Sequence, residues 1–141
     1  MRILGIDYGD ARTGFAVCDP TGMLASAVET FHSHKMEEVA QRTAEHAQAY
    51  QAEELVLGFP KNMNNTQGPR AEKTLELKAR LEELLPDTPI VLWDERSTTV
   101  SAIRILNETN TRGKKRKNVV DSVAAVLILE SYLAYRRSHE K

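Results

Sequence analysis

The sequence, 141 residues long, lacks the features that mark several classes of protein. Its single cysteine, Cys18, cannot form an internal disulfide, so nothing indicates an oxidising compartment. Its longest apolar run, Val123 to Leu129, is far shorter than the roughly 18 residues of a membrane-spanning helix. The first residues also lack the apolar core and the cleavage site of a signal peptide. We therefore expect a cytoplasmic protein without a membrane partner.

An excess of charge of one sign is missing as well. The chain has 19 Lys and Arg against 20 Asp and Glu, a net charge of −1, which excludes a uniformly basic nucleic-acid binder and a strongly acidic tail protein. Five of the positive charges, however, fall within the six residues 112–117. The remainder holds 14 Lys and Arg against 20 Asp and Glu, a net charge of −6. The balance therefore conceals an acidic body with one concentrated basic segment.

Internal repeats, low-complexity tracts and linkers are absent too. The length matches one compact domain, which typically has ~100–150 residues, and it falls short of a two-lobed enzyme. We expect a single domain over residues 1–138, followed by a short polar tail at residues 139–141.

Hydrophobic patterning predicts an α/β fold that opens with three antiparallel strands. Residues 3–8 and 13–17 are apolar runs joined by a Gly/Asp turn, and a Pro/Gly turn then leads to a third strand at 24–31. The chain next alternates helix and strand, which predicts a mixed five-stranded sheet with parallel strands and helices on both faces. The apolar run 90–93 is typical of a central strand. The later elements are expected as helices at 35–50, 70–85, 97–108 and 118–137 and strands at 55–57 and 90–93.

Acidic residues lie at the ends of three of these elements. Asp7 interrupts an otherwise apolar strand, and Asp94 and Glu95 directly follow the run 90–93. Asp121 falls in the first turn of the expected last helix, on the face that should pack on the sheet. A charged group on such a face needs a partner, because burying it alone costs several kcal/mol.

Each acid also has a purely structural explanation. Asp7 could accept backbone N–H bonds from the turn that follows it, and the acids after residue 93 could pair with Arg96. Asn118 could be the N-cap of the last helix, with Asp121 at its third position. Taken together, however, clustered carboxylates need cations, and hard divalent ions such as Mg²⁺ or Mn²⁺ prefer oxygen ligands. Two such ions ~4 Å apart can catalyse displacement at a phosphodiester.

Two further segments could contact phosphate. Residues 58–68 combine glycines and amides with Lys61 and Asn62, although an ordinary polar loop would look the same. The basic run 112–117 could be a solvated loop, but it directly precedes Asp121, and this position favours nucleic-acid binding. Trp93, at the end of a buried strand, is expected to be a core residue rather than a stacking surface.

Four motifs occur along the chain in the order found in one protein family. They are Gly5-Ile6-Asp7-Tyr8-Gly9 with Arg12, Thr13 and Gly14; Gly58-Phe59-Pro60 with Asn62 and Met63; Asp94-Glu95-Arg96 with Thr98, Thr99 and Ala102; and Asp121-Ser122 with Ala124, Ala125 and Leu129. On these residues the chain resembles the YqgF family, also described as RuvX-like or Holliday-junction-resolvase-like, of the RNase H-like superfamily. The resemblance implies an RNase H-like fold. It also implies a bacterial nuclease that processes the 5′ end of the 16S rRNA precursor or, in an older assignment, cleaves Holliday junctions.

The family pattern resembles an acidic site for divalent metal. Carried onto this chain, it implies that Asp7, Glu95 and Asp121 bind Mg²⁺ or Mn²⁺, as two ions, and act in catalysis. Asp94 is the alternate to Glu95, because strand alternation points the two side chains in opposite directions. Phe59 is a conservative departure from the family, which more often has a smaller aliphatic residue there. The residues expected to position the nucleic-acid backbone are Arg12, Lys61, Asn62, Arg96, Arg112, Lys114, Lys115, Arg116 and Lys117.

Other classes of function remain open. Residues 5–9 also resemble the first phosphate loop of sugar kinases and actin-like ATPases, but those proteins close two such domains over ATP. A non-catalytic RNA-binding protein of ribosome assembly is a second alternative. The expected partners are precursor rRNA, or branched DNA in the alternative, together with ribosomal particles, and the chain itself is expected as a monomer or weak homodimer.

Overall fold

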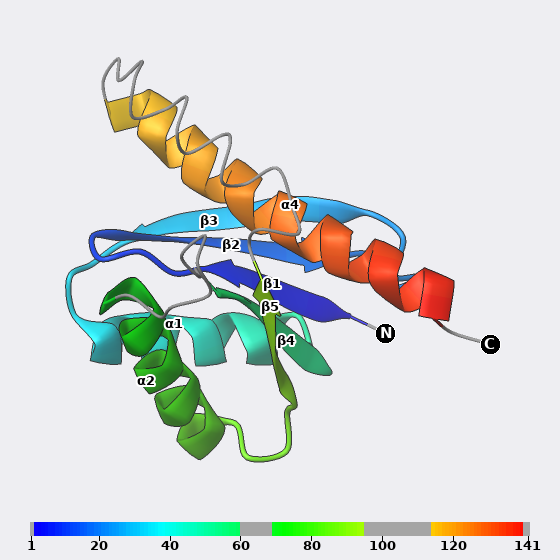
Figure 1. The fold of residues 1–141 in the computed structure, drawn as a ribbon, viewed down its shortest axis with the longest axis horizontal. Helices are drawn as coiled ribbons and strands as arrows, with labels where there is room; N and C mark the ends of the chain where they lie inside the picture. The colour runs from blue at the N-terminus through cyan, green and yellow to red at the C-terminus, as the bar shows by residue number, and fades with distance from the viewer. Residues whose placement is uncertain (1, 60–68, 95–113, 140–141) are drawn as a thin grey trace.

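The computed structural model describes residues 2–59, 69–94 and 114–139, and within 114–122 it describes only the helical backbone. Figure 1 shows these elements along the chain. In chain order they are β1 (Ile3–Asp7), β2 (Arg12–Cys18), β3 (Ala25–His32), α1 (Met36–Ala49), β4 (Glu54–Phe59), α2 (Pro69–Leu84), β5 (Ile90–Asp94) and α4 (Lys114–His139). The helix predicted at 97–108 lies outside the described residues.

The five strands form one mixed sheet in the order β3-β2-β1-β4-β5. The pairs β1–β2 and β2–β3 are antiparallel, whereas β1–β4 and β4–β5 are parallel, which confirms the predicted topology. Ile6 pairs with Leu57, and Phe59 pairs with Asp94. The ends of β1, β4 and β5 therefore meet along one side of the sheet, which we call the carboxyl edge.

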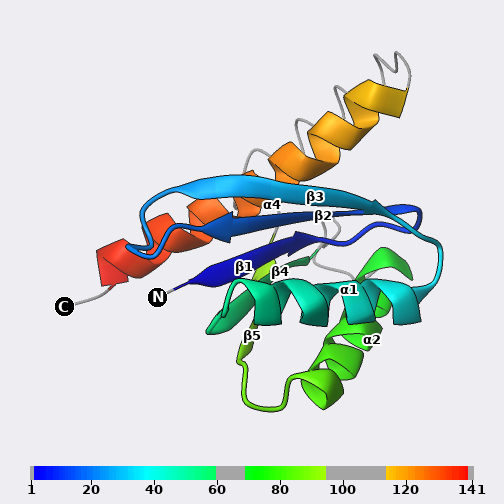
Figure 2. The ribbon, with the colours of Figure 1, turned by 180° about the vertical axis from the view of Figure 1, so that it is seen from behind.

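Helices cover both faces of this sheet. α4 crosses one face, and α1 and α2 lie on the other, as both views show (Figure 1, Figure 2). Leu4 and Ile6 are fully buried among residues of α1 and α2, whereas Ile3 is buried among residues of α4. Because side chains alternate along a strand, Asp7 belongs to the same face as Ile3, the α4 face.

The two short helices follow the sequence periodicity closely. α1 and α2 each begin and end within one residue of the predicted bounds. The buried positions of α1 recur at helical spacing, and Thr43 among them satisfies its hydroxyl by donating to the Val39 carbonyl at 2.7 Å. None of the described helices combines the length and the apolar character that crossing a membrane requires.

Two sequence predictions about local structure are wrong. The last helix begins at Lys114 rather than at residue 118, so the segment 114–117, expected as a loop, is helical. Lys and Arg are strong helix formers, and the helix therefore extends through them instead of starting at an Asn118 cap. Asp121 consequently lies beyond the first turn.

The second correction concerns β5, which was expected to be a central strand. Within the described sheet β5 is outermost, and all of its five residues are half-buried. Within the described sheet it pairs with β4 alone, and its apolar side chains pack against the two hydrophobic clusters on the opposite faces of the sheet.

Close packing of α4 on β1 depends on Gly5. A β-carbon at this position would lie 2.9 Å from the Leu129 β-carbon and 3.2 Å from the Ala125 carbonyl oxygen. The backbone of β1 therefore contacts α4 with no side chain between them. This contact fixes the position of the helix relative to the end of the strand.

We expect Gly5→Ala to lower the free energy of unfolding by about 1–3 kcal/mol, because the added methyl group pushes α4 away from β1. Urea unfolding followed by circular dichroism measures this change. The exposed substitution Ser26→Ala in β3 is the control and should leave the midpoint unchanged. A Gly5→Ala variant as stable as the parent would show that α4 does not depend on the close approach.

Candidate active site

Asp7 is the last residue of β1 and lies at the carboxyl edge. Its side chain is only 4% exposed, and its cross-strand neighbour is Gly14 of β2. A carboxylate at this depth requires polar or cationic partners to offset the loss of hydration. Asp7 is thus a buried acid on the α4 face, at the side of the sheet where functional groups of α/β proteins collect.

The path of α4 brings position 121 toward the same place. Ala125 and Leu129 of α4 contact β1 at Gly5, and Leu133 lies near Ile3, so α4 runs antiparallel to β1. One helical turn back from Ala125, about 6 Å, leads to position 121. Two strand residues onward from Gly5, about 7 Å, lead to Asp7. Positions 7 and 121 therefore both lie on the carboxyl-edge side of the Gly5 contact. The Asp121 side chain itself is outside the described residues.

Asp94 also ends a strand at the carboxyl edge, but it belongs to the other face. Along β5, Val91 and Trp93 pack on the α4 face, and Ile90 and Leu92 pack on the α1/α2 face. Alternation places Asp94 with the second pair. Asp7 and Asp94 are therefore on opposite faces of the sheet.

The turn between β1 and β2 is held in place by the first turns of α2. Arg70 donates from Nη2 to the Tyr8 carbonyl at 3.2 Å, and Lys73 Nζ lies 3.1 Å from Asp10 Oδ1. The turn is tight, since a β-carbon on Gly9 would lie 2.5 Å from the Arg12 carbonyl. Burial, with the nearby Asp10 carboxylate, raises the pKa of Tyr8. These contacts set the position of the chain immediately after Asp7.

Arg70 and Lys73 were missed as candidate residues, because the sequence presents them only as exposed positions on a helix. The i,i+3 spacing of two cations in the first turns of α2 was the only available signal. The structure adds that both side chains reach the turn beside Asp7. The exposed Lys73–Asp10 pair adds little stability, so the two cations matter more for their position at the carboxyl edge.

The structure describes only some of the remaining predicted site residues. Arg12 begins β2 and pairs with His32, and alternation assigns it to the same face as Gly14, the neighbour of Asp7. Among the described residues, no three His, Cys, Asp or Glu side chains gather as a metal site. Lys61, Asn62, Glu95, Arg96 and Arg112 lie outside the described residues, and for Lys114, Lys115, Arg116, Lys117 and Asp121 only the helical backbone is described.

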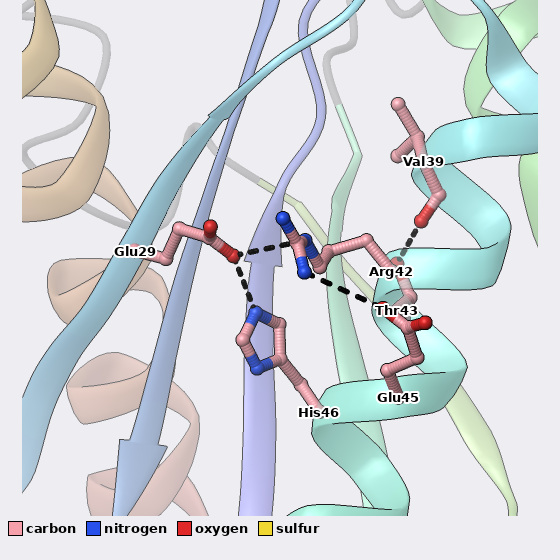
Figure 3. Close-up of polar contacts among 6 residues, drawn as sticks. All are labelled: Glu29, Val39, Arg42, Thr43, Glu45 and His46. Atoms are coloured by element: carbon pink, nitrogen blue, oxygen red, sulfur yellow. Dashed lines mark hydrogen bonds and ion pairs between the residues drawn. The ribbon is translucent and has the colours of Figure 1, made fainter.

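A second polar cluster lies on the opposite face, between β3 and α1 (Figure 3). Glu29 Oε2 is 2.6 Å from His46 Nε2 and 3.3 Å from Arg42 Nε. The Arg42 guanidinium lies 4.7 Å from the centroid of the Phe31 ring, and the His46 ring lies 4.9 Å from the centroid of the Phe15 ring. These contacts attach β3 to α1, so the cluster is structural and separate from Asp7.

The C-terminal half of α4 is fixed by one polar group on β4. Glu54 Oε1 accepts a hydrogen bond from the Tyr132 hydroxyl at 2.7 Å and pairs with Arg136 Nη1 at 3.0 Å. Burial, with the hydrogen bond to Glu54, raises the pKa of Tyr132 to about 12. Together with the Gly5 contact, this anchor determines how α4 crosses the sheet.

This anchor predicts a loss of stability at alkaline pH. The folded chain holds the Tyr132 proton up to a pKa of about 12, whereas the unfolded chain releases it near the ordinary tyrosine pKa of about 10. The stabilisation is therefore complete below pH 10 and is lost as the pH rises toward 12. Urea unfolding between pH 9 and pH 11.5 should show a smaller decline for Tyr132→Phe than for the parent chain. Parallel declines would contradict the raised pKa.

Comparison with known proteins identifies the relatives of this chain. A family model described as "RuvX: Holliday junction resolvase" matches residues 1–135. A protein of Acetivibrio thermocellus named "Putative pre-16S rRNA nuclease" is 46% identical over 134 residues, which cover 94% of this chain and 95% of that protein. A protein of the same name from Listeria monocytogenes is 46% identical over 135 residues, covering 94% and 97%.

Solved structures agree with this relationship at the level of the fold. Thermus thermophilus RuvC in complex with Holliday junction substrate superposes with a TM-score of 0.63 at 13% identity, covering 100% of this chain and 98% of that one. A second structure of RuvC from Thermus thermophilus gives a TM-score of 0.59 at 13% identity, covering 98% and 97%. The chain therefore has an RNase H-like fold and belongs to the RuvX family.

Proposed function

We propose that this protein is an endonuclease that hydrolyses phosphodiester bonds in structured nucleic acid, with the 5′ end of precursor 16S rRNA as its substrate. The observation that carries the proposal is Asp7, a buried carboxylate at the carboxyl edge, on the face crossed by the helix that contains Asp121. Relatives at 46% identity named as pre-16S rRNA nucleases support the choice of substrate.

The three acids Asp7, Glu95 and Asp121 would hold divalent metal, Mg²⁺ or Mn²⁺, as two ions. The donor set fits these ions, because every donor is a carboxylate oxygen and Asp7 is withdrawn from solvent. When bound, such ions supply an activated water and stabilise the departing 3′ oxygen. In this proposal the carboxylates of the three acids bind the ions and fix their position at the carboxyl edge.

Alternation along β5 favours Glu95 over Asp94 as the third acid. Trp93 packs on the α4 face, the face of Asp7, whereas Asp94 belongs to the other face. The same alternation, continued by one residue, would return position 95 to the face of Asp7. We therefore assign the metal-binding role to Glu95 and keep Asp94 as the alternate.

The basic residues would position the nucleic-acid backbone. The cationic segment 114–117 forms the start of α4, and position 121 follows about one helical turn later, about 6 Å along the axis. Phosphates held by this segment would thus lie close to the acids. The proposed backbone contacts are Arg12, Lys61, Asn62, Arg96, Arg112, Lys114, Lys115, Arg116 and Lys117.

A branched DNA substrate is the second candidate, because the matching family is described as a Holliday junction resolvase. One experiment separates the two. End-labelled precursor 16S rRNA and a labelled four-way DNA junction are incubated with the protein in Mg²⁺, Mn²⁺ or EDTA. We expect metal-dependent cleavage of the RNA that leaves a 5′-phosphate. Cleavage of the junction alone would assign the protein to DNA, and cleavage of neither would favour a non-catalytic RNA-binding role.

A further inference from the structure

Four rings gather where β5 meets the C-terminal half of α4. We call them the aromatic cluster: Trp93, Tyr132, Tyr135 and His139. The centroid of the Trp93 ring lies 5.5 Å from that of Tyr132 and 5.3 Å from that of Tyr135. The Tyr135 and His139 rings follow at 4.1 Å, with an interplanar angle of 31°. The rings thus form a continuous series from the sheet outward.

The inner rings of this series are fixed, and the outer rings are open to solvent. Tyr132 is buried and bonded to Glu54, and the Trp93 Nε1 donates to the Ser131 hydroxyl at 3.1 Å. Tyr135, in contrast, is 47% exposed, and His139 is exposed as well. The expectation that Trp93 is a core residue therefore holds only in part, because Trp93 is half-buried. The Trp93 ring contacts the exposed ring of Tyr135, which is therefore held in place between Trp93 and His139.

The charges beside the open rings suit an anionic ligand. The last turn of α4 carries Arg136, Arg137 and His139. Glu54, the carboxylate that bonds to Tyr132 of the cluster, is also paired with Arg136. The end of α4 that carries the exposed rings is thus rich in basic side chains. Flat aromatic rings beside cations are the combination that binds unpaired bases and their phosphates.

The aromatic cluster lies on the α4 face of the sheet, the face to which Asp7 belongs. Trp93 precedes Asp94 at the carboxyl edge and packs on the face to which Asp7 belongs. On α4, positions 121, 128 and 135 follow one another at intervals of seven residues and therefore share one side of the helix. Position 135 is about 21 Å along the axis from position 121. A strand that leaves the acids could reach the exposed rings by following α4.

We propose that the aromatic cluster binds unpaired bases of a single-stranded segment next to the cleavage site, with Tyr135 as the stacking surface. This proposal rests on the proposed nuclease function for its substrate, but binding itself needs neither metal nor cleavage. The sequence contains one tryptophan, so the fluorescence of Trp93 reports directly on the cluster.

The test is a fluorescence titration of the full chain in EDTA. Oligo(U) and oligo(dT) are the single-stranded probes, and an abasic oligonucleotide of equal length provides the same phosphates without bases. We expect quenching of Trp93 by either base-containing strand and none by the abasic strand. Quenching by the abasic strand to the same extent, or by none of the probes, would overturn the proposal.

Variants make the test specific to one ring. Tyr135→Ala should weaken the binding of single strands about tenfold, in keeping with the loss of one stacked base, and Tyr135→Phe should restore it. Leu84→Ala, at 45% exposure on α2, is the matched control and should bind like the parent. If Tyr135→Ala fails to fold in circular dichroism, His139→Ala replaces it. Unchanged affinity in the folded variant would contradict the proposal even if metal-dependent cleavage is found.

Discussion

Asp7→Asn should reduce metal-dependent cleavage by roughly 10²–10³-fold or more while the chain stays folded. Asparagine keeps the size of the side chain but removes the negative charge that would hold a divalent ion. The position tolerates this change because Asp7 is 4% exposed, and a neutral side chain at that depth is easier to bury than a charged one. Initial rates on labelled precursor rRNA in Mg²⁺ and in Mn²⁺ measure the effect.

Two further measurements make this result interpretable. Asp87→Asn changes an exposed aspartate before β5, at the opposite end of that strand from the carboxyl edge, and should cleave at the parental rate. Urea unfolding should give nearly the same stability for Asp7→Asn as for the parent, and RNA binding in EDTA should also be retained. An Asp7→Asn protein that is folded and fully active would place the chemistry elsewhere in the molecule.

Alanine at all five basic residues of 112–117 should produce the second large effect, on binding rather than on catalysis. Each lost phosphate contact lowers the slope of log K against log salt by about 0.7 on single strands and 0.9 on duplex. Five lost contacts would therefore flatten the slope by as much as about 3.5–4.5, and affinity at low salt should fall more than tenfold. Titrations of precursor rRNA at several salt concentrations measure both quantities.

This variant should stay folded, because the substitutions favour the start of α4. Cations at a helix N-terminus oppose the macrodipole, and alanine has the highest helix propensity, so the start of α4 should become more stable. Alanine at Lys78 and Arg80, in the middle and later turns of α2, is the control for a general loss of charge. A salt slope unchanged in the five-residue variant but reduced in the α2 control would move the binding face to α2.

Local pattern was sufficient to predict most of the fold. The periodicity of α1 and α2 is amphipathic over three or more turns, so their bounds are correct to one residue. The start of α4 could not be found in this way. Its first residues, 114–117, are charged on every side, and a charge run has no apolar face to indicate a helix. The outermost position of β5 depends on which strands pair, which an apolar run of four residues does not specify.

The residues of the candidate site likewise separate into those with a local sequence signal and those without one. Asp7 was conspicuous because an acid inside an apolar strand contradicts the local pattern. Arg70 became visible only when the fold brought it to the Tyr8 carbonyl, 62 residues away in the sequence. The aromatic cluster has the same origin, since Trp93 and Ser131 are 38 residues apart and belong to a strand and a helix. Contacts of this range follow from tertiary packing and leave no local signal.

The close contact between α4 and Gly5 has a consequence for the chain while it is being synthesised. β1, with Asp7, is synthesised well before α4. Until α4 packs on β1, the face of the sheet that carries Asp7 lacks the cover that α4 provides, and the proposed metal ligand Asp121 is not yet brought toward it. If Asp7 and Asp121 act together as proposed, a growing chain lacks the assembled site until α4 is in place. Under the proposed function, nuclease activity would then arise only after α4 has packed on β1.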